Sequence, residues 1–366
     1  MSPKAKRILT ALAASVVAVW LVVCGLAWRL YRSPLGTPLQ IPTATPAPME
    51  ATPAPTATTP PSSNPQTPPA VVASPTFTQP LPTATPVKGM CGGPPVMYIL
   101  IMGARMNVWD NSDTIRVIRV DFVKPEVVVI PFPRDLIVEL PQEFVDKTGF
   151  GSPVKLASVN NLGSPAWLWD ADPAGGVILL AQVLEQNFGV RVDHYVALDG
   201  LIFDNFVNDI GGLPICLPEP VVDEEQGANF PAGCQVLDGH DALLLARIRK
   251  DVGDFGRIER QHLIVKSLLK QMTTNPYVIA QLPALVNKYR QRVLTSLTPQ
   301  DITQLLCLFT RIDPQNEIRF LEVPKELFQD GAYEIYLAFQ PVVAYGLKWD
   351  QNYLDWVQKA MAGEIK

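Results

Sequence analysis

Four arginines fall within fourteen residues of the stretch Ala246-Arg-Ile-Arg-Lys-Asp-Val-Gly-Asp-Phe-Gly-Arg-Ile-Glu-Arg-Gln261. Arg247 and Arg249 are two positions apart, so in an extended segment both side chains point the same way. Gly253 and Gly256 permit a tight bend after them. The stretch therefore predicts that several guanidinium groups gather at one place in the fold.

A helix is expected to begin near Arg257. Gln261 lies four residues later and shares a face of this helix with Arg257. At about 100° per residue the same face carries the apolar residues Ile258, Val265 and Leu268, so the two polar side chains lean toward the core or a cleft in it. Clustered guanidiniums beside apolar surface suit a phosphate group, because each planar fork can donate two hydrogen bonds. The competing interpretation is a solvated basic turn with local pairing to Asp251, Asp254 and Glu259.

The composition argues against several classes of protein. The chain has 366 residues and a formal net charge of −5, and it has no long basic run, so we expect no nucleic-acid partner. Its three histidines show no metal-ligand spacing, which makes a zinc site a poor prediction. The nucleotide-binding patterns G-x-x-x-x-G-K and G-x-G-x-x-G and the hydrolase pattern G-x-S-x-G do not occur.

The N-terminal sequence predicts a membrane anchor. Residues 1–7 form a short basic tail, and residues 8–28 are 21 residues without a charge. As a helix they span roughly 30 Å, enough to cross a bilayer. We expect an uncleaved single-pass helix in the cytoplasmic membrane, with residues 1–7 cytoplasmic and the rest of the chain extracytoplasmic. The main alternative is a cleaved signal peptide.

Residues 33–88 differ in composition from the rest of the chain. They contain sixteen of the 36 prolines together with many Thr and Ala residues. Such a segment buries too little apolar surface to order itself. We expect a disordered linker that lifts a domain off the membrane, reaching on the order of 170 Å when fully extended.

The globular domain is expected over residues 89–366. Apolar runs predict strands at 96–102, 114–121, 126–131, 194–198 and 317–323. Helical periodicity predicts helices at 177–187, 201–209, 237–245, 257–271, 276–291, 298–309 and 349–361, with Asp238 as the cap of the third of them. Strands that alternate with helices indicate an α/β layered domain.

Four of the five cysteines fall in this domain. Cys216 and Cys234 bracket a Pro-rich and acidic loop and form the better candidate disulfide, which an extracytoplasmic location permits. Cys91 and Cys307 follow as a pair only by elimination. Buried free thiols are the alternative for all four.

Several blocks of the domain resemble the LytR–CpsA–Psr family of bacterial cell-envelope proteins. The blocks keep the family's order over roughly residues 96–270. They are Tyr98-Ile-Leu-Ile-Met-Gly103, Ser112-Asp-Thr114, Pro133-Arg-Asp135, Lys155, Asp193-His-Tyr-Val196, Val207-Asn-Asp-Ile-Gly-Gly212, Leu237-Asp-Gly-His-Asp-Ala-Leu243, Arg247-Ile-Arg249, Asp254-Phe-Gly-Arg257 and Arg260-Gln261.

This resemblance implies an αβα sandwich with a central mixed sheet and a hydrophobic pocket for a polyprenyl chain. It also implies transfer of a glycopolymer from an undecaprenyl-pyrophosphate carrier to peptidoglycan, which leaves a phosphodiester link. In the family Mg²⁺ assists this reaction.

The resemblance also implies roles for individual residues. The catalytic set comprises Asp113, Arg134, Arg247 and Arg249. The pyrophosphate would be bound by Lys155, Arg257 and Gln261. Asp113 would hold magnesium or help to activate the sugar hydroxyl. For Asp135, pairing with a local backbone group or an arginine competes with a catalytic role.

Two positions depart from the family pattern. An acidic residue usually follows the glycine of the first strand by two positions, but here Gly103 is followed by Ala104 and Arg105. The family usually has an arginine directly before Ser-Asp-Thr, where this chain has Asn111. Asp110 is a candidate replacement for the missing carboxylate. The alternative function is therefore a degenerate member that binds polyprenyl-phosphate-linked glycan or cell-wall polymer without transferring it.

Overall fold

The computed structural model describes residues 25–39, 89–104, 107–167, 171–249, 253–289, 292–313 and 316–365. Residues 1–41 and 87–366 belong to one unit, and residues 42–86 form another. The expected cytoplasmic tail, most of the expected span and nearly all of the expected linker lie outside the described residues. Among the described helices, none combines the length and the apolar character that crossing a bilayer requires.

A six-stranded sheet forms the centre of the domain, in the order β11-β6-β1-β2-β3-β12. Its strands are β1 (Val96–Ala104), β2 (Ser112–Asp121), β3 (Glu126–Pro131), β6 (His194–Asp199), β11 (Leu294–Thr295) and β12 (Ile318–Phe320). β1 pairs with β2 antiparallel and with β6 parallel, and β12 pairs with β3 parallel. This result confirms the central mixed sheet of the predicted fold class.

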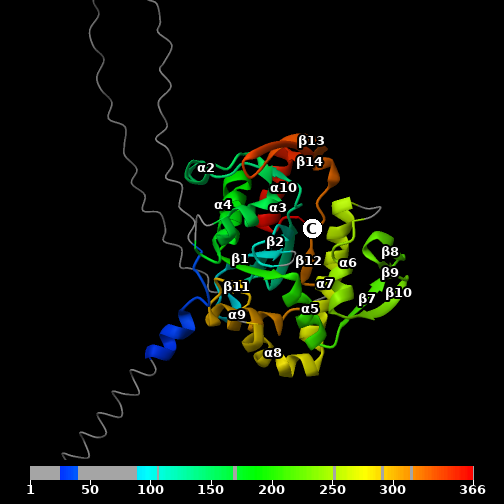
Figure 1. The fold of residues 1–366 in the computed structure, drawn as a ribbon. Coiled ribbons are helices and arrows are strands. Elements are labelled where there is room, and N and C mark those ends of the chain that lie inside the picture. Colours follow the sequence, from blue (N-terminus) through cyan, green and yellow to red (C-terminus); the bar gives the residue numbers. More distant parts are fainter. Residues whose placement is uncertain are drawn as a thin grey trace, which may run out of the picture. The chain divides into compact units, whose positions relative to one another are not determined.

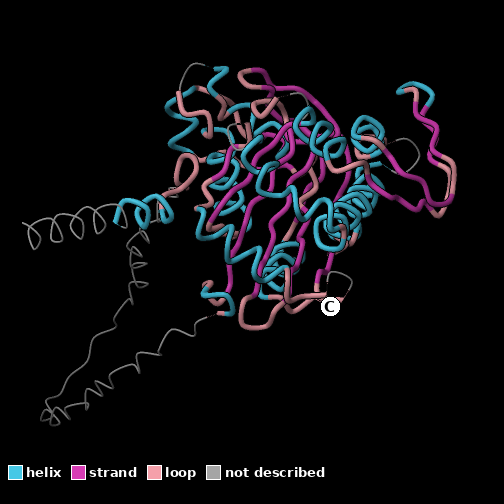
Figure 2. Tube along the Cα trace, turned by 90° about the horizontal axis from the view of Figure 1, so that it is seen from below, coloured by secondary structure: helices cyan, strands magenta, loops and turns pink. Residues whose placement is uncertain are grey.

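Both faces of the sheet are covered by helices (Figures 1 and 2). Successive side chains of β1 point to opposite faces. Leu100 and Met102 pack into one core cluster, whereas Met97 and Ile99 pack into another. The first cluster is covered by α3 (Leu156–Leu162), α4 (Gly175–Phe188) and α10 (Gln351–Ala362), and the second by α9 (Pro299–Phe309).

A third core cluster lies among α5 (Gly200–Asp209), α6 (Gly239–Leu245), α7 (Gly253–Thr274) and α8 (Pro276–Tyr289). It includes residues of β7 (Leu213–Leu217) and β10 (Gly233–Leu237). These strands continue into a second short pair, β8 (Val221–Asp223) and β9 (Ala228–Phe230), with the 3-10 turn η3 (Glu224–Gln226) between them. Both views show this ribbon projecting away from the central sheet (Figures 1 and 2).

Two disulfides cross-link the domain. Cys216 and Cys234 are directly opposite partners in β7 and β10, and their bond closes the base of the ribbon. Cys91, in η1 (Met90–Gly92), is bonded to Cys307 in α9. The structure thus pairs all four of the domain's cysteines.

The remaining elements complete the face covered by α3 and α4. They are α2 (Gln142–Thr148), β4 (Ile137–Val138), β5 (Val154–Lys155), η2 (Pro165–Trp167), η4 (Lys325–Leu327) and the hairpin of β13 (Phe328–Leu337) and β14 (Gln340–Trp349). The last helix is tied to the first strand, because the hydroxyl of Tyr98 donates to the carbonyl oxygen of Met361 at 2.8 Å.

Two local expectations have clear outcomes, and one hairpin was not expected. Asp238 caps α6 as predicted, with its side chain accepting from the backbone N–H of Asp241. The predicted bend at Gly253 and Gly256 is wrong in extent: α7 begins at Gly253, which has a φ of 63°, and Gly256 lies inside the helix. A glycine tolerates this left-handed φ at the helix start, so no further break is needed. The hairpin of β13 and β14 was not predicted.

Candidate active site

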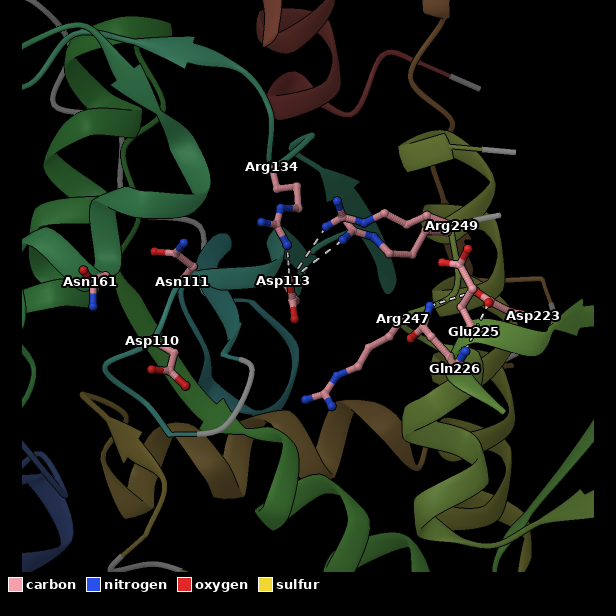
Figure 3. A pocket seen from close by; sticks show the side chains of 11 residues that line it. Asp110, Asn111, Asp113, Arg134, Asn161, Asp223, Glu225, Gln226, Arg247 and Arg249 are labelled. Atoms are coloured by element: carbon pink, nitrogen blue, oxygen red, sulfur yellow. Dashed lines mark hydrogen bonds and ion pairs between the residues drawn. The ribbon is translucent and has the colours of Figure 1, made fainter. Parts of the chain in front are cut away.

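Asp113, near the start of β2, lies at the centre of an arginine cluster. Its Oδ1 accepts from Nη1 of Arg134. The same oxygen lies 4.0 Å from Nη2 of Arg249 and 3.9 Å from Nη1 of Arg257. Figure 3 shows Arg134 entering from one side of Asp113 and Arg249 from the other. Segments that are far apart in sequence therefore converge on one carboxylate.

This arrangement has the donors that an anionic group needs. Three guanidinium groups lie within 4.0 Å of one carboxylate oxygen. The side chain of Arg257 is only 2% exposed, whereas that of Arg249 is 43% exposed and can reach a ligand. A solvated turn would leave all of these groups in water, so the burial of Arg257 favours the phosphate-binding interpretation.

The arginines line a polar cleft of about 1010 Å³. Figure 3 shows Arg247 reaching into it from the side of α6 and the ribbon. The ribbon itself contributes Asp223, Glu225 and Gln226, which the sequence had not marked as site residues. The described residues that line this polar cleft are Asp110, Asn111, Asp113, Arg134, Asn161, Asp223, Glu225, Gln226, Arg247, Arg249 and Arg257.

An apolar pocket of about 270 Å³ adjoins the cleft. It lies between the β1–β2 side of the sheet and helices α5 and α7, with lining residues that include Ile101, Ile118, Phe203, Ile264 and Leu268. Asp113 and Arg247 line both the apolar pocket and the polar cleft. An amphiphile could therefore place its charged group in the cleft and its hydrocarbon in the pocket.

A buried polar network holds the wall of the apolar pocket. Nη2 of Arg116 donates to Oε1 of Gln261 at 2.9 Å, and Nη1 of Arg116 lies 2.9 Å from Nε2 of His262. Burial, with the charges of Arg116 and Lys266, lowers the pKa of His262 to about 3. The imidazole is therefore neutral, and Nε2 accepts from Arg116.

Helix α7 also positions the arginine-bearing turn after α6. Nη2 of Arg260 donates to the carbonyl oxygen of Ile248, and Nε2 of Gln261 donates to that of Ala246 at 3.1 Å. These two bonds fix the backbone on both sides of Arg247. Gln261 lines the apolar pocket and not the polar cleft, so its place in the structure is that of a support for the turn.

The loop before β2 is fixed by α3. Nδ2 of Asn160 donates to the carbonyl oxygens of Val108 and Asp110 at 2.8 and 2.7 Å. α3 approaches α4 closely, because a Cβ on Gly176 would lie 2.2 Å from the carbonyl oxygen of Asn160. This contact brings Asp110 and Asn111 to the cleft, while residue 105 lies outside the described part of the chain.

Lys155 lies apart from the residues that line the cleft. Its Nζ donates to Oδ1 of Asp135 at 3.0 Å and lies 5.8 Å from the ring centre of Tyr345. The side chain of Asp135 therefore pairs with a lysine, a partner that the sequence analysis did not consider for it. The geometry brings together Asp113, Arg134, Arg247, Arg249 and Arg257, but it does not bring Lys155 or Gln261 into the polar cleft.

Comparison with known proteins supports the resemblance. A protein-family model described as the LytR_cpsA_psr family matches residues 95–345. The chain belongs to the LytR–CpsA–Psr family. The matched region contains every residue of the arginine cluster.

Curated relatives match parts of this LytR–CpsA–Psr chain. "Regulatory protein MsrR" of Staphylococcus aureus (strain COL) is 27% identical over 238 residues, 63% of this chain and 66% of the relative. "Cell wall biosynthesis protein LcpA" of Corynebacterium glutamicum is 33% identical over 199 residues, 50% of this chain and 38% of the relative. The chain thus spans less than two thirds of the length of either relative.

Solved structures share the LytR–CpsA–Psr fold. B. subtilis TagV superposes with a TM-score of 0.56 at 23% identity, covering 74% of this chain and 96% of TagV. Protein gbs0355 from Streptococcus agalactiae gives a TM-score of 0.58 at 18% identity, covering 74% of this chain and 87% of that one. A structure described as "TagT bound to LIIa-WTA" gives 0.52 at 18% identity, with 74% and 90% covered.

The donors in the cleft suit a hard divalent cation. Among the described residues there is no cluster of three or more His, Cys, Asp and Glu side chains that could hold a metal. The cleft does contain the carboxylates of Asp110 and Asp113 and the amide oxygens of Asn111 and Asn161. Mg²⁺ commonly takes one or two carboxylates and completes its shell with water and substrate phosphates, so these residues fit Mg²⁺ only together with a phosphate ligand.

Proposed function

We propose that this protein is a membrane-anchored phosphotransferase that attaches a glycopolymer from an undecaprenyl-pyrophosphate carrier to peptidoglycan. One observation carries the proposal. A cleft lined by four arginines, which suits a pyrophosphate, adjoins an apolar pocket that suits a hydrocarbon chain, and Asp113 and Arg247 line both. Membership of the LytR–CpsA–Psr family and similarity to a protein named for cell wall biosynthesis support it.

The cleft would stabilise charge on the pyrophosphate. Arg134, Arg249 and Arg257 would donate to its non-bridging oxygens, and Arg247 would hold the end nearest the pocket. The oxygen of an acceptor sugar hydroxyl would attack the phosphorus that carries the glycan. The bond between this phosphorus and the bridging oxygen would break, polyprenyl monophosphate would leave, and a phosphodiester would remain between glycan and acceptor.

The hydroxyl proton needs an acceptor near the attacking oxygen. Asp113 is the carboxylate at the centre of the arginines, and its Oδ2 is not the atom that binds Arg134. We propose that Asp113 takes up this proton and passes it to solvent. Asp110 and Asp113 would also hold Mg²⁺, which would neutralise phosphate charge when bound.

The anchor and the location belong to the same proposal. The apolar run of residues 8–28 would be the single span, with residues 89–366 on the extracytoplasmic side. The two disulfides of the domain suit an oxidising compartment. The carrier lipid and peptidoglycan would then be accessible to the same face of the membrane.

The test is a transfer assay with the full chain in detergent or vesicles. A polyprenyl-pyrophosphate-linked glycan and a soluble peptidoglycan oligomer are incubated with Mg²⁺, and the products are resolved by mass spectrometry. We expect a phosphodiester-linked product and free polyprenyl monophosphate, both reduced at least tenfold in Arg249→Ala. Tight binding of the carrier with no product at any Mg²⁺ concentration would contradict transfer.

That outcome would support the alternative of a binding protein without transfer activity. One observation favours this alternative: Asn111 lines the cleft at the position where the family usually has an arginine. The variant Asn111→Arg separates the two functions. Gain of transfer in this variant, with none in the wild type, would identify the site as degenerate.

A further inference from the structure

The short segment that follows the expected span lies against the domain. We call residues 33–39 the strap. The backbone N–H of Leu35 donates to the carbonyl oxygen of Leu297 at 3.0 Å. Oγ1 of Thr37 donates to Oδ1 of Asp172 at 3.0 Å, and the hydroxyl of Tyr195 donates to the carbonyl oxygen of Thr37 at 2.7 Å. The strap is thus joined to three separate parts of the domain.

The fit between strap and domain is close. A Cβ built on Gly36 would lie 2.7 Å from the carbonyl oxygen of Thr295, so a larger residue cannot occupy this position without displacing the backbone. Leu39 packs against the main core cluster. Burial, and then the charge of Asp172, raises the pKa of Tyr195 to about 12, so its hydroxyl remains a donor throughout the physiological range.

The part of the domain that the strap contacts at Asp172 adjoins the loop that carries Asp110. Oδ1 of Asp172, which accepts from the strap, also accepts from the backbone N–H of Ala174 at 2.9 Å. Between them, the carbonyl oxygen of Pro173 accepts from Nε1 of Trp109 at 3.2 Å. The strap therefore contacts the turn at residues 172–174. This turn contacts the loop of Trp109, which also carries Asp110 of the polar cleft.

We propose that the strap clamps the domain directly beside the end of the membrane span. The unit that contains the domain also contains the strap, because residues 1–41 and 87–366 form a single unit. The membrane part of this inference rests on the proposed anchor.

The geometry sets how far the domain can stand from the bilayer. Leu35 lies seven positions after Trp28, the expected end of the span, and residues 25–32 are helical. Four helical steps and three extended ones cover roughly 17 Å. A fully extended linker would instead allow on the order of 170 Å. The strap would keep the part of the domain that it contacts close to the bilayer surface.

The test is site-specific photocrosslinking in the full chain. A photoreactive phenylalanine analogue replaces Leu35, which is 44% exposed and tolerates a larger side chain, or Leu30, which is 71% exposed and precedes the strap. A protease site inserted within residues 42–86 is cut after irradiation, and denaturing gels report whether the N-terminal fragment remains attached to the domain. We expect attachment from position 35 and not from position 30.

The decisive control is Gly36→Val in the variant labelled at position 35. Its side chain overlaps the carbonyl of Thr295 and should lower the crosslink yield roughly fivefold or more. Equal yields from positions 30 and 35, or a yield unchanged by Gly36→Val, would overturn the docked strap. Membrane fractionation of the uncut protein tests the anchor separately, because the crosslink reports docking wherever the protein is found.

Discussion

Nη1 of Arg257 lies 3.9 Å from Oδ1 of Asp113, and the arginine that makes this contact is almost completely buried. A cation in that position depends on its surroundings for charge compensation. Arg257 is therefore part of the protein's structure as well as of its anion site. Loss of Arg257 would disturb packing and binding together, so Arg249, which is more exposed, is the better probe of ligand binding.

Arg249→Ala should weaken binding without unfolding the domain. Its side chain is half-exposed and reaches the same carboxylate as the buried arginine. We expect affinity for a polyprenyl pyrophosphate to fall by about 1–3 kcal/mol, the range for hydrogen bonds to charged groups. Titration calorimetry measures the affinity, and melting curves should be unchanged. Arg311→Ala, at an exposed position that does not line the cleft, is the matched control. Equal affinities in the two variants would contradict the assignment.

Asp113→Asn should make the protein less stable but more responsive to anions. The substitution keeps the size of the side chain and removes the charge that Arg134, Arg249 and Arg257 share. We expect the free energy of unfolding to fall by about 1–3 kcal/mol and added inorganic pyrophosphate to restore it. Thermal shifts with and without pyrophosphate measure both effects. Glu225→Gln, at an exposed position of the same cleft, should show neither effect.

Gln261→Ala tests whether this residue supports the turn or binds the substrate. Both ends of its amide are engaged, by Arg116 and by the carbonyl of Ala246. We expect a loss of about 1–3 kcal/mol in the free energy of unfolding. The loss of polyprenyl pyrophosphate affinity should be smaller than in Arg249→Ala. The opposite pattern, weaker binding at unchanged stability, would show direct contact with the pyrophosphate, as the family resemblance implied.

His262 should make the domain sensitive to mild acid. Its pKa falls from 6.5 to about 3 on folding, so below pH 6.5 the unfolded chain binds a proton that the native state does not. The stability that depends on this neutral imidazole is complete above pH 6.5 and is lost as the pH falls toward 3. The slope approaches about 1.4 kcal/mol per pH unit.

Denaturant titrations between pH 7.5 and pH 5 measure this slope. His262→Gln retains an acceptor for Arg116 and removes the titrating group, so its stability should vary less with pH than that of the wild type. His240, which is exposed, provides the control: His240→Gln should keep the wild-type slope. A wild-type slope that His262→Gln does not reduce would show that other groups govern the acid response.

The strands of the central sheet could be predicted from the sequence because they are buried on both faces. β3 occupies Glu126–Pro131, as predicted, since an unbroken run of Val and Ile residues suits a strand with two covered faces. The hairpin of β13 and β14 has no such run. Ile335 is buried while Val343 is exposed, and the backbone N–H of Leu347 bonds to Asp135, more than two hundred residues earlier. Its position depends on partners that no local pattern identifies.

In the candidate site, too, local patterns predicted some features, and only tertiary contacts determine the others. Clustering of Arg247, Arg249 and Arg257 follows from their spacing, and the structure brings them together. Arg116 could not be recognised in this way, because an arginine within a strand reads as a solvent-facing residue. It is buried since Gln261 and His262, 145 and 146 positions away, accept its hydrogen bonds. The ribbon residues of the cleft wall were missed for the related reason that only tertiary structure brings them there.

The bond between Tyr98 and Met361 also bears on when the domain can close during its biogenesis. The first strand of the sheet and the last helix of the chain are 263 positions apart, and Tyr353 and Val357 of that helix fill the same core cluster as Leu100. A ribosome must therefore finish nearly the whole polypeptide before this cluster has all its members. Until then the nascent chain remains incompletely packed, which is the condition in which a polypeptide can be threaded through a narrow pore.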